Sequence, residues 1–212
     1  MKNDKKISTP VLRRLPKYYR HLEELSRNGV EKISSKDLSK LINVTASQIR
    51  QDLNCFGGFG QQGYGYNVST LRDNLADILG VTKRFTAIII GVGHLGQALA
   101  NHTTLDRSGV DLVGLFDISS DVVGSEVAGL TVKNISEAYR FCLETHIDVA
   151  ILTVPKSEAV SVATVLANAG VKGFWNFANT EITVPGKSIC VENVYMGDSL
   201  MKLCYEVQSS ED

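Results

Sequence analysis

The sequence predicts an α/β protein in which a small helical domain with a β-hairpin precedes a domain built on a parallel β-sheet. Two observations support this prediction. From residue 86 onward, apolar runs of strand length alternate with helical segments, which is the pattern of a parallel sheet with right-handed crossovers. Before residue 81, short segments of helical periodicity surround a stretch rich in glycine and aromatic residues. We expect domains at residues 1–80 and 81–193, followed by a terminal helix and tail at 194–212.

Composition excludes several classes of protein. The chain has 212 residues, of which 43% are hydrophobic and 21% charged, and these values are typical of a globular protein. No apolar run approaches the length of about 20 residues that a membrane span requires, and residues 1–9 lack the apolar core of a signal peptide. The four cysteines are far apart and form no C-x-x-C motif, which favours reduced thiols over a disulfide or zinc framework. We therefore expect a cytoplasmic protein without a membrane partner or a metal site.

Charge is distributed unevenly along the chain. Residues 1–56 contain 12 Lys and Arg against 6 Asp and Glu, a net charge of +6, whereas the remainder contains 10 against 17, a net charge of −7. A basic segment joined to an acidic remainder favours a polyanion partner for the N-terminal domain alone. A chance solvated face explains the charge equally well, because net charge reports on non-specific binding and not on fold.

The N-terminal domain is predicted to contain a helix-turn-helix. A first helix is expected after Thr9-Pro10, and Ser34 is placed to cap a second helix that runs to Ile42. Asn43-Val44 makes a tight turn, after which Thr45 is placed to cap a third helix. Two short helices joined by a tight turn are the helix-turn-helix arrangement found in DNA-binding proteins.

The third helix presents a polar face suited to nucleic acid. Its apolar positions 49, 53 and 56 repeat at helical spacing and are expected inside, which leaves hydroxyl, amide and guanidinium groups outside. Such groups hydrogen-bond to base edges and phosphates, although any exposed helix can carry a similar face. The outward residues are Ser47, Gln48, Arg50, Gln51 and Asn54. Our candidate DNA-binding residues on this helix are Thr45, Ser47, Gln48, Arg50 and Gln51.

A β-hairpin is predicted over residues 57–66, where glycines and aromatic residues surround a polar tip. A helix-turn-helix followed by a hairpin is a winged helix, whose wing tip would lie along the DNA backbone or in the minor groove. Gln61, Gln62 and Tyr64 therefore join the candidate DNA-binding residues, and a plain glycine-rich loop is the alternative. Ser69 is expected to cap a further helix that ends at Gly80.

Residues 86–96, TAIIIGVGHLG, predict the strand, turn and helix of a dinucleotide-binding site. Gly91 would allow the tight turn, Gly93 would let the backbone approach a pyrophosphate, and Gly96 would let the helix pack on the strand. The free N–H groups at the helix N-terminus would then face the phosphates. The candidate cofactor-binding residues of this loop are Gly91, Val92, Gly93, His94, Leu95 and Gly96.

An acidic residue follows at the distance that such a site requires. The next predicted strand, residues 111–116, ends at Asp117, which lies 21 residues after Gly96. A carboxylate there would accept a hydrogen bond from a ribose 2′-hydroxyl and repel a 2′-phosphate, so NAD(H) is favoured over NADP(H). The alternative is that Asp117 only caps the following turn. Asp117 and Ile118 are added to the candidate cofactor-binding residues.

Further strands are predicted at 148–154, 172–177 and 188–191, with helices at 136–144 and 158–169. Ligands of open parallel sheets bind beyond the carboxyl ends of the strands. Residues at two of these ends therefore complete the candidate cofactor site, namely Thr153, Val154, Pro155, Asn176, Phe177 and Ala178.

The last predicted helix, residues 195–207, has one apolar side. That side packs either on a partner subunit or on the sheet of its own chain.

In this order, the segments resemble the Rex family of redox-sensing transcriptional repressors. The matching pieces are LPKYYRHLEEL at 15–25, TASQIRQDL at 45–53, FGGFGQQGYGYNV at 56–68, LRDNLADILG at 71–80, IIIGVGHLGQAL at 88–99, LFD at 115–117, DVAILTVP at 148–155, GVKGFWNFA at 170–178 and VENV at 191–194. The resemblance implies a homodimer whose winged helices bind a palindromic operator in double-stranded DNA and whose terminal helices are exchanged between subunits. It also implies that NADH rotates the subunits and releases DNA, whereas NAD⁺ competes with NADH and favours the DNA-bound state.

Three positions depart from the family pattern. Gln61-Gln62 replaces a Lys-Arg pair at the wing tip, so phosphate contacts are expected to be weaker or minor-groove preference to change. His102 replaces an aromatic residue near the nicotinamide. Tyr195 replaces an acid at the start of the last helix, and Arg20 matches the basic residue that pairs with that acid in the family. We therefore expect switch contacts that differ in detail.

Three functions other than that of a sensor-repressor are compatible with parts of the sequence. An NAD-dependent oxidoreductase needs a proton-transfer group near the nicotinamide, and His94 and His102 are the candidates, but no substrate domain is expected after residue 193. A coenzyme A-binding module shares the glycine fingerprint, but Asp117 argues against it. A thiol switch in the four cysteines is the last alternative, and no neighbouring residue is expected to activate a thiol. We therefore expect a non-enzymatic protein without catalytic residues that binds NADH, NAD⁺ and operator DNA.

Overall fold

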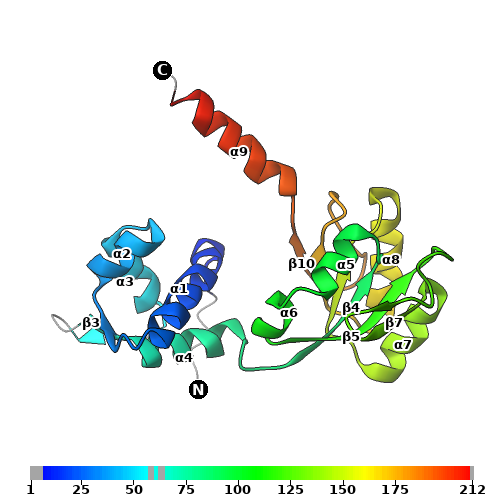
Figure 1. Cartoon of the computed structure of the whole chain (residues 1–212), viewed down its shortest axis with the longest axis horizontal. Coiled ribbons are helices and arrows are strands. Elements are labelled where there is room, and N and C mark those ends of the chain that lie inside the picture. Colours follow the sequence, from blue (N-terminus) through cyan, green and yellow to red (C-terminus); the bar gives the residue numbers. More distant parts are fainter. Residues whose placement is uncertain (1–6, 57–59, 62–64, 211–212) are drawn as a thin grey trace. The chain divides into compact units, whose positions relative to one another are not determined.

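A computed structural model describes residues 7–56, 60–61 and 65–210 of the chain (Figure 1). The chain divides into two compact units, Met1–Lys83 and Arg84–Asp212. Among the described residues, no helix is both long and apolar enough to cross a membrane.

In its described residues, the first unit consists of four helices and a small antiparallel sheet. Its elements are α1 (Thr9–Arg27), β1 (Lys32–Ile33), α2 (Ser35–Ile42), α3 (Ala46–Asn54), β2 (Gly60–Gln61), β3 (Gly65–Asn67) and α4 (Val68–Leu79). The three strands pair in the order β1–β3–β2, both pairs antiparallel. One apolar cluster holds the unit together, with Leu15 and Tyr18 of α1, Leu38 of α2 and Ile49 of α3 at its centre. Helix-turn-helix and hairpin together form a winged helix.

Side-chain caps fix where these helices begin. The hydroxyl of Ser34 accepts the backbone N–H of Asp37 at 3.0 Å, and that of Thr45 accepts the N–H of Gln48 at 3.2 Å, as the sequence predicts. The expected cap at Ser69 is wrong. Asn67 caps α4 instead, because its side-chain oxygen accepts the N–H of Thr70, so the helix begins two residues earlier.

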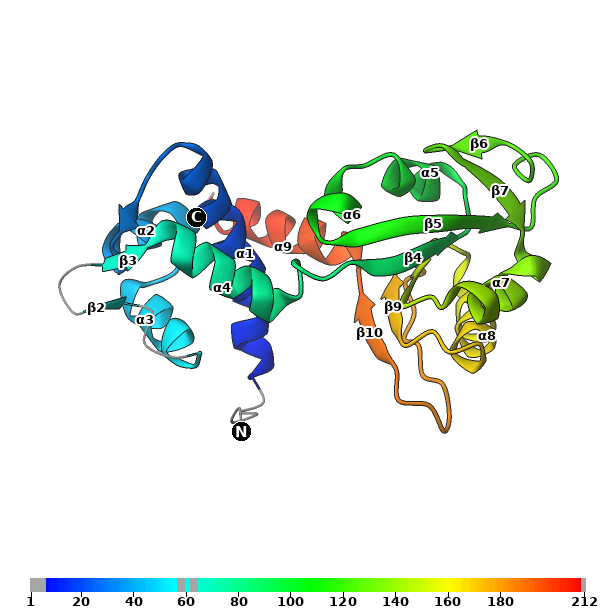
Figure 2. The ribbon, with the colours of Figure 1, turned by 90° about the horizontal axis from the view of Figure 1, so that it is seen from below.

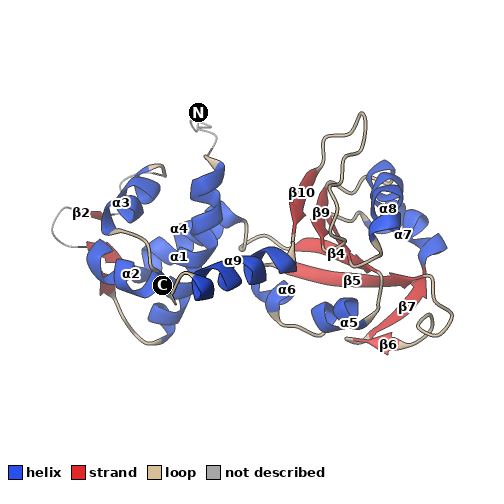
Figure 3. Cartoon of the chain, turned by 90° about the horizontal axis from the view of Figure 1, so that it is seen from above, coloured by secondary structure: helices blue, strands red, loops and turns tan. Residues whose placement is uncertain are grey.

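The second unit is a parallel sheet with helices on both faces (Figures 2 and 3). Its elements are β4 (Phe85–Ile90), α5 (His94–Ala100), α6 (Thr104–Arg107), β5 (Val110–Asp117), β6 (Glu126–Val127), β7 (Leu130–Asn134), η1 (Ile135–Glu137), α7 (Ala138–Thr145), β8 (Val149–Leu152), α8 (Lys156–Asn168), β9 (Gly173–Asn176), β10 (Cys190–Asn193) and α9 (Met196–Gln208). The strand order is β10–β9–β8–β4–β5–β7–β6, and only β6 pairs antiparallel. The short β6–β7 hairpin was not predicted from the sequence.

The central strand β4 is buried on both faces, which explains its continuous apolar sequence. Ile88 and Ile90 belong to the cluster that α7 and α8 cover, whereas Ile89 belongs to the cluster on the α5 and α6 side. Because β4 pairs with β5 on one side and with β8 on the other, its carboxyl end lies between theirs. Residues from three strands therefore meet at this edge, where the glycine-rich loop begins.

Candidate functional site

The glycine-rich loop joins β4 to α5 at the carboxyl edge of the sheet. Gly91 has a φ of +92°, and a Cβ there would lie 2.7 Å from the carbonyl oxygen of Thr153. A Cβ at Gly96 would collide with the carbonyl oxygen of Gly91. Both positions therefore require glycine. At Gly93, by contrast, a Cβ would meet no atom within 4 Å, so the loop leaves open space beside the first residue of α5, His94.

Side chains from neighbouring strands hold this loop in place. The hydroxyl of Thr153 donates to the carbonyl oxygen of Gly91. One carboxylate oxygen of Asp117 accepts the backbone N–H of Val92, and the other accepts the N–H of Ser119 at 2.8 Å. Asp117 thus fixes the loop and also caps the following turn, as the alternative interpretation expected. An ionised carboxylate offers about four acceptor positions. Asp117 can therefore still accept a hydrogen bond from a hydroxyl group of a ligand.

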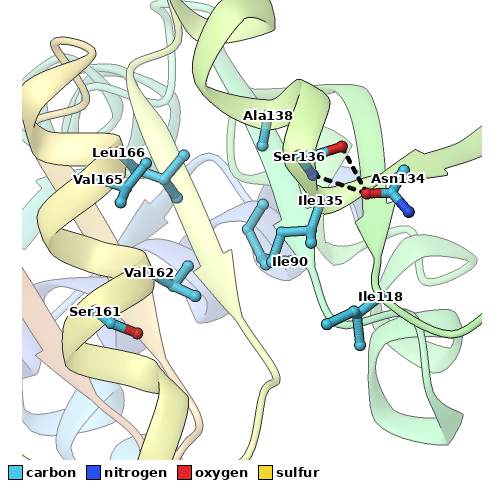
Figure 4. A pocket seen from close by; sticks show the side chains of 10 residues that line it. All are labelled: Ile90, Ile118, Asn134, Ile135, Ser136, Ala138, Ser161, Val162, Val165 and Leu166. Atoms are coloured by element: carbon cyan, nitrogen blue, oxygen red, sulfur yellow. Dashed lines mark hydrogen bonds between the residues drawn. The ribbon is translucent and has the colours of Figure 1, made fainter.

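An apolar pocket of about 390 Å³ lies next to Asp117, between α8 and the start of α7 (Figure 4). Ile118, which is 80% exposed, lies at one side of the pocket. Side chains of α8 face those of η1 across it. The lining residues are Ile90, Ile118, Asn134, Ile135, Ser136, Ala138, Ser161, Val162, Val165 and Leu166. Apart from Ile118, none of them was a sequence candidate. They come from strands β4 and β7, from η1 and from helices α7 and α8, whose apolar patterns give no sign that a pocket lies between them.

The other predicted cofactor residues lie at the ends of β8 and β9. Val154 and Pro155 follow β8, and the side chain of Val154 comes close to the Gly91 turn. Asn176 is almost completely buried, and its polar atoms have partners: its amide donates to Thr180 and Asn193, and its oxygen accepts the N–H of Ala178. Its side chain therefore shapes the loop after β9. Phe177 packs edge-on against Trp175, with ring centroids 4.7 Å apart.

The candidate DNA-binding residues differ in whether their side chains are exposed or already hydrogen-bonded within the protein. Ser47 and Gln51 are exposed on α3. Arg50 donates to the hydroxyl of Ser35 on α2 at 2.9 Å, and the Thr45 hydroxyl caps the helix. The backbone of Gln61 pairs with that of Gly65 in the β2–β3 ladder. Gln62 and Tyr64 lie outside the described residues.

A buried polar cluster joins α3 to α1. Asp52 is only 1% exposed, and its carboxylate accepts hydrogen bonds from Arg14 at 2.6 and 2.7 Å and from the hydroxyl of Tyr18 at 2.6 Å. Gln48, a candidate DNA-binding residue, donates its side-chain amide to the same carboxylate at 2.8 Å. Burial alone would raise the pKa of Asp52, but the hydrogen bonds from Arg14, Tyr18 and Gln48 outweigh it and lower that pKa. Asp52 is therefore ionised at neutral pH.

Two of the family departures have local partners. The ring nitrogen Nδ1 of His102 accepts the backbone N–H of Thr104 at 3.1 Å. Tyr195 immediately precedes α9, and its hydroxyl donates to Glu181 at 2.8 Å. This hydrogen bond raises the pKa of the Tyr195 hydroxyl. Arg20 is exposed on α1.

Within the described residues of the second unit, the terminal helix α9 leaves its apolar side exposed. Its apolar residues at helical spacing are 52–61% exposed, and the stripe consists of Met196, Leu200, Leu203 and Val207. An exposed, contiguous apolar stripe is typical of a surface that interacts with another molecule.

Comparison with known families agrees with both halves of this description. A family model described as the N-terminus of putative DNA-binding proteins matches residues 6–54, and a model of a CoA binding domain matches residues 82–180. The redox-sensing transcriptional repressor Rex of Caldanaerobacter subterraneus subsp. tengcongensis is 48% identical over 97% of this chain and 91% of its own. The Rex of Clostridium tetani is 45% identical over the full length of both chains.

Solved structures give the same result. RSP in complex with β-NAD⁺ and operator DNA superposes with a TM-score of 0.90 at 47% identity, covering 97% of this chain and 94% of that one. RSP in complex with β-NADH gives a TM-score of 0.90 at 43% identity, covering 98% and 97%. The superpositions confirm the fold class. The relatives are named as repressors and not as enzymes, which confirms the resemblance and the expectation of a non-enzymatic protein. The chain belongs to the Rex family of redox-sensing transcriptional repressors.

Proposed function

We propose that this chain is a homodimeric transcriptional repressor that binds operator DNA through residues 1–80 and NADH or NAD⁺ through residues 81–193, and that NADH releases the DNA. The main observation in support is that one chain combines a polar recognition helix with a glycine-rich loop held by Asp117. A relative has been crystallised both with β-NADH and with β-NAD⁺ and operator DNA, which supports both ligands. We place the protein in the cytoplasm, where such DNA is found.

The residues at the carboxyl edge of the sheet fit a dinucleotide. The open space at Gly93 admits a pyrophosphate against the N–H groups at the start of α5. Asp117 would accept a hydrogen bond from the 2′-hydroxyl of the adenine ribose, and the apolar pocket beside Ile118 offers apolar surroundings suited to a flat adenine ring. The loops after β8 and β9, with Val154 and Phe177, remain for the nicotinamide end. In this protein the nucleotide acts as a ligand and no hydride transfer is assigned to it.

The homodimer is supported by the exposed stripe of α9. Four apolar side chains at helical spacing gain free energy if a second copy covers them. Two winged helices brought together in this way match the two halves of a palindromic operator.

The switch requires that NADH bind the DNA-incompetent arrangement of the dimer more tightly than the competent one. A ligand with equal affinity for both arrangements shifts nothing, however tightly it binds. NAD⁺ must occupy the same site and must bind the DNA-competent arrangement at least as tightly as the incompetent one. We therefore expect NADH not only to bind, but to bind the DNA-free dimer more tightly than the DNA-bound dimer.

The test uses the full chain and a duplex selected from a random library by the protein in the presence of NAD⁺. In a gel-shift or fluorescence-anisotropy titration, NADH is expected to dissociate the complex while NAD⁺ leaves it intact. A complex that persists in NADH contradicts the proposal, as does a protein that sediments as a monomer at the concentrations where it binds DNA.

Coenzyme A is a second candidate ligand, because the family model that matches residues 82–180 describes a CoA binding domain. We favour NADH, since the carboxylate of Asp117 would repel a phosphate group on the adenine ribose. Calorimetric titration separates the two: NADH is expected to bind and coenzyme A is not, and the reverse result would replace the proposed ligand.

A further inference from the structure

We infer that Gln48 reads an adenine in the major groove of the operator and that Asp52 orients its side-chain amide for that contact. This inference rests on the proposed DNA-binding function and adds which base α3 recognises and how.

The hydrogen bond between the two side chains determines which way the amide faces. Nε2 of Gln48 lies 2.8 Å from Oδ1 of Asp52. An ionised carboxylate only accepts hydrogen bonds, so the NH₂ group of Gln48 and not its oxygen must face Asp52. One hydrogen of that NH₂ group is used. The carbonyl oxygen Oε1 and the second hydrogen remain, and Oε1 accepts no hydrogen bond from the residues that the structure describes.

Asp52 itself is held rigidly. Arg14 donates twice to its carboxylate, at 2.6 and 2.7 Å, and Tyr18 donates once at 2.6 Å, so with Gln48 the carboxylate accepts four hydrogen bonds. These fill its acceptor positions. Because Asp52 is also buried, rotation would break several charge-assisted bonds without water to replace them. The orientation imposed on Gln48 is therefore fixed before DNA arrives.

The free edge of Gln48 matches one base. Gln48 is the third residue of α3, and the first residues of a recognition helix are those that contact base edges. An oxygen acceptor beside an N–H donor pairs with N6–H and N7 of adenine. Guanine presents two acceptors there, O6 and N7, so Oε1 would face an acceptor without a hydrogen between them. Adenine is therefore preferred at this position.

Gln51 provides a matched control. It carries the same amide on the same helix and is exposed, but its side chain has no hydrogen bond to a described residue. Its amide can rotate by 180° to suit either an acceptor or a donor, so discrimination between adenine and guanine is expected to depend on Gln48 and not on Gln51.

The experiment measures the affinity of the full-length protein, with NAD⁺ present, for a selected operator and for duplexes with each base pair replaced in turn. For the wild type, changing one A·T pair per half-site to G·C is expected to weaken binding about 10-fold or more. Gln48→Ala should abolish the discrimination between A·T and G·C at that pair only. Gln51→Ala should retain the discrimination at that pair. Wild-type discrimination at every pair in Gln48→Ala would overturn the inference, whereas a wild-type protein that binds no operator would refute the proposed function.

Asp52→Asn tests the orientation. Arg14 donates to both carboxylate oxygens, so the new NH₂ group meets a donor of Arg14 in either placement, and the cluster that holds Gln48 in one orientation is disrupted. The amide of Gln48 can then rotate, so the preference for adenine over guanine at that pair should weaken, with the other pairs unchanged. An equal loss of affinity for all duplexes would overturn the orienting role. If thermal unfolding shows that Asp52→Asn does not fold, Tyr18→Phe replaces it. It should lower discrimination at that pair alone, and unchanged discrimination would overturn the role.

Discussion

Replacing Gly93 with alanine separates the cofactor site from the stability of the fold. A Cβ at Gly93 would meet no atom within 4 Å, and its φ of −71° is ordinary for alanine. Reduced freedom of the unfolded chain favours alanine by about 0.4–1 kcal/mol, and loss of glycine at a helix N-cap costs about 1 kcal/mol. The two effects oppose each other, so we expect the free energy of unfolding without ligand to change by less than about 1 kcal/mol.

The same methyl group would occupy the space proposed for the pyrophosphate. Displacing the pyrophosphate removes at least two charge-assisted hydrogen bonds, each worth about 1.5–3 kcal/mol. The dissociation constant for NADH should therefore rise about 100-fold or more. Isothermal calorimetry measures this directly.

Thermal and chemical unfolding provide an independent measurement. At an NADH concentration 100 times the wild-type dissociation constant, the ligand should stabilise the wild type by about 2.7 kcal/mol and Gly93→Ala by about 0.4 kcal/mol or less. Gly96→Ala is the contrasting variant. Its Cβ would collide with the backbone oxygen of Gly91, so it should lose about 1–3 kcal/mol of stability without any ligand. If Gly93→Ala binds NADH as the wild type does, the pyrophosphate does not lie at this loop.

Three further predictions concern DNA binding, assembly and pH. Replacing Gln61 and Gln62 with Lys and Arg should raise operator affinity at low salt and steepen the slope of log K against log salt by about 2, and an unchanged slope would show that the wing tip does not contact phosphates. Changing both Leu200 and Leu203 to Asp should convert the dimer to monomers in analytical ultracentrifugation and weaken operator binding, whereas a stable dimer would show that α9 is not the interface. Asp52 has a lowered folded-state pKa, so its stabilisation should be complete above its unfolded pKa of about 3.9 and be lost as pH falls through the folded value. The free energies of unfolding of wild type and Asp52→Asn in urea should therefore differ by a constant amount from pH 7 to 5, and the difference should shrink as pH falls below about 4. A difference that stays constant below that pH would contradict this role.

Local sequence signals predicted the elements of this fold well. The isoleucine run of β4 and the spacing of Gly91, Gly93 and Gly96 determine strand, turn and helix within a few residues of one another. Thr45 caps α3 as expected because the cap and its partner are three residues apart. Such features depend on neighbours along the chain, so a single sequence reveals them.

Features that depend on distant residues were not predictable. Asp52 contacts Arg14 and Tyr18, 38 and 34 positions away, and nothing local distinguishes it from an exposed helical carboxylate. The apolar pocket brings together Ile118, η1 and α8, whose patterns individually resemble core packing. The β6–β7 hairpin is short and has only one fully buried residue, Val132, so its period-2 alternation is too brief to recognise.

In the proposed homodimer, the exposed stripe of α9 makes repression depend on the protein concentration by mass action. A protomer that leaves Met196, Leu200, Leu203 and Val207 in water is the species favoured at high dilution. A single winged helix contacts only half of a palindromic operator. Where dimers dissociate, the occupancy of the operator should therefore depend more steeply than linearly on the cellular concentration of the protein. Expression level would then set the range of nucleotide ratios over which the regulated genes respond.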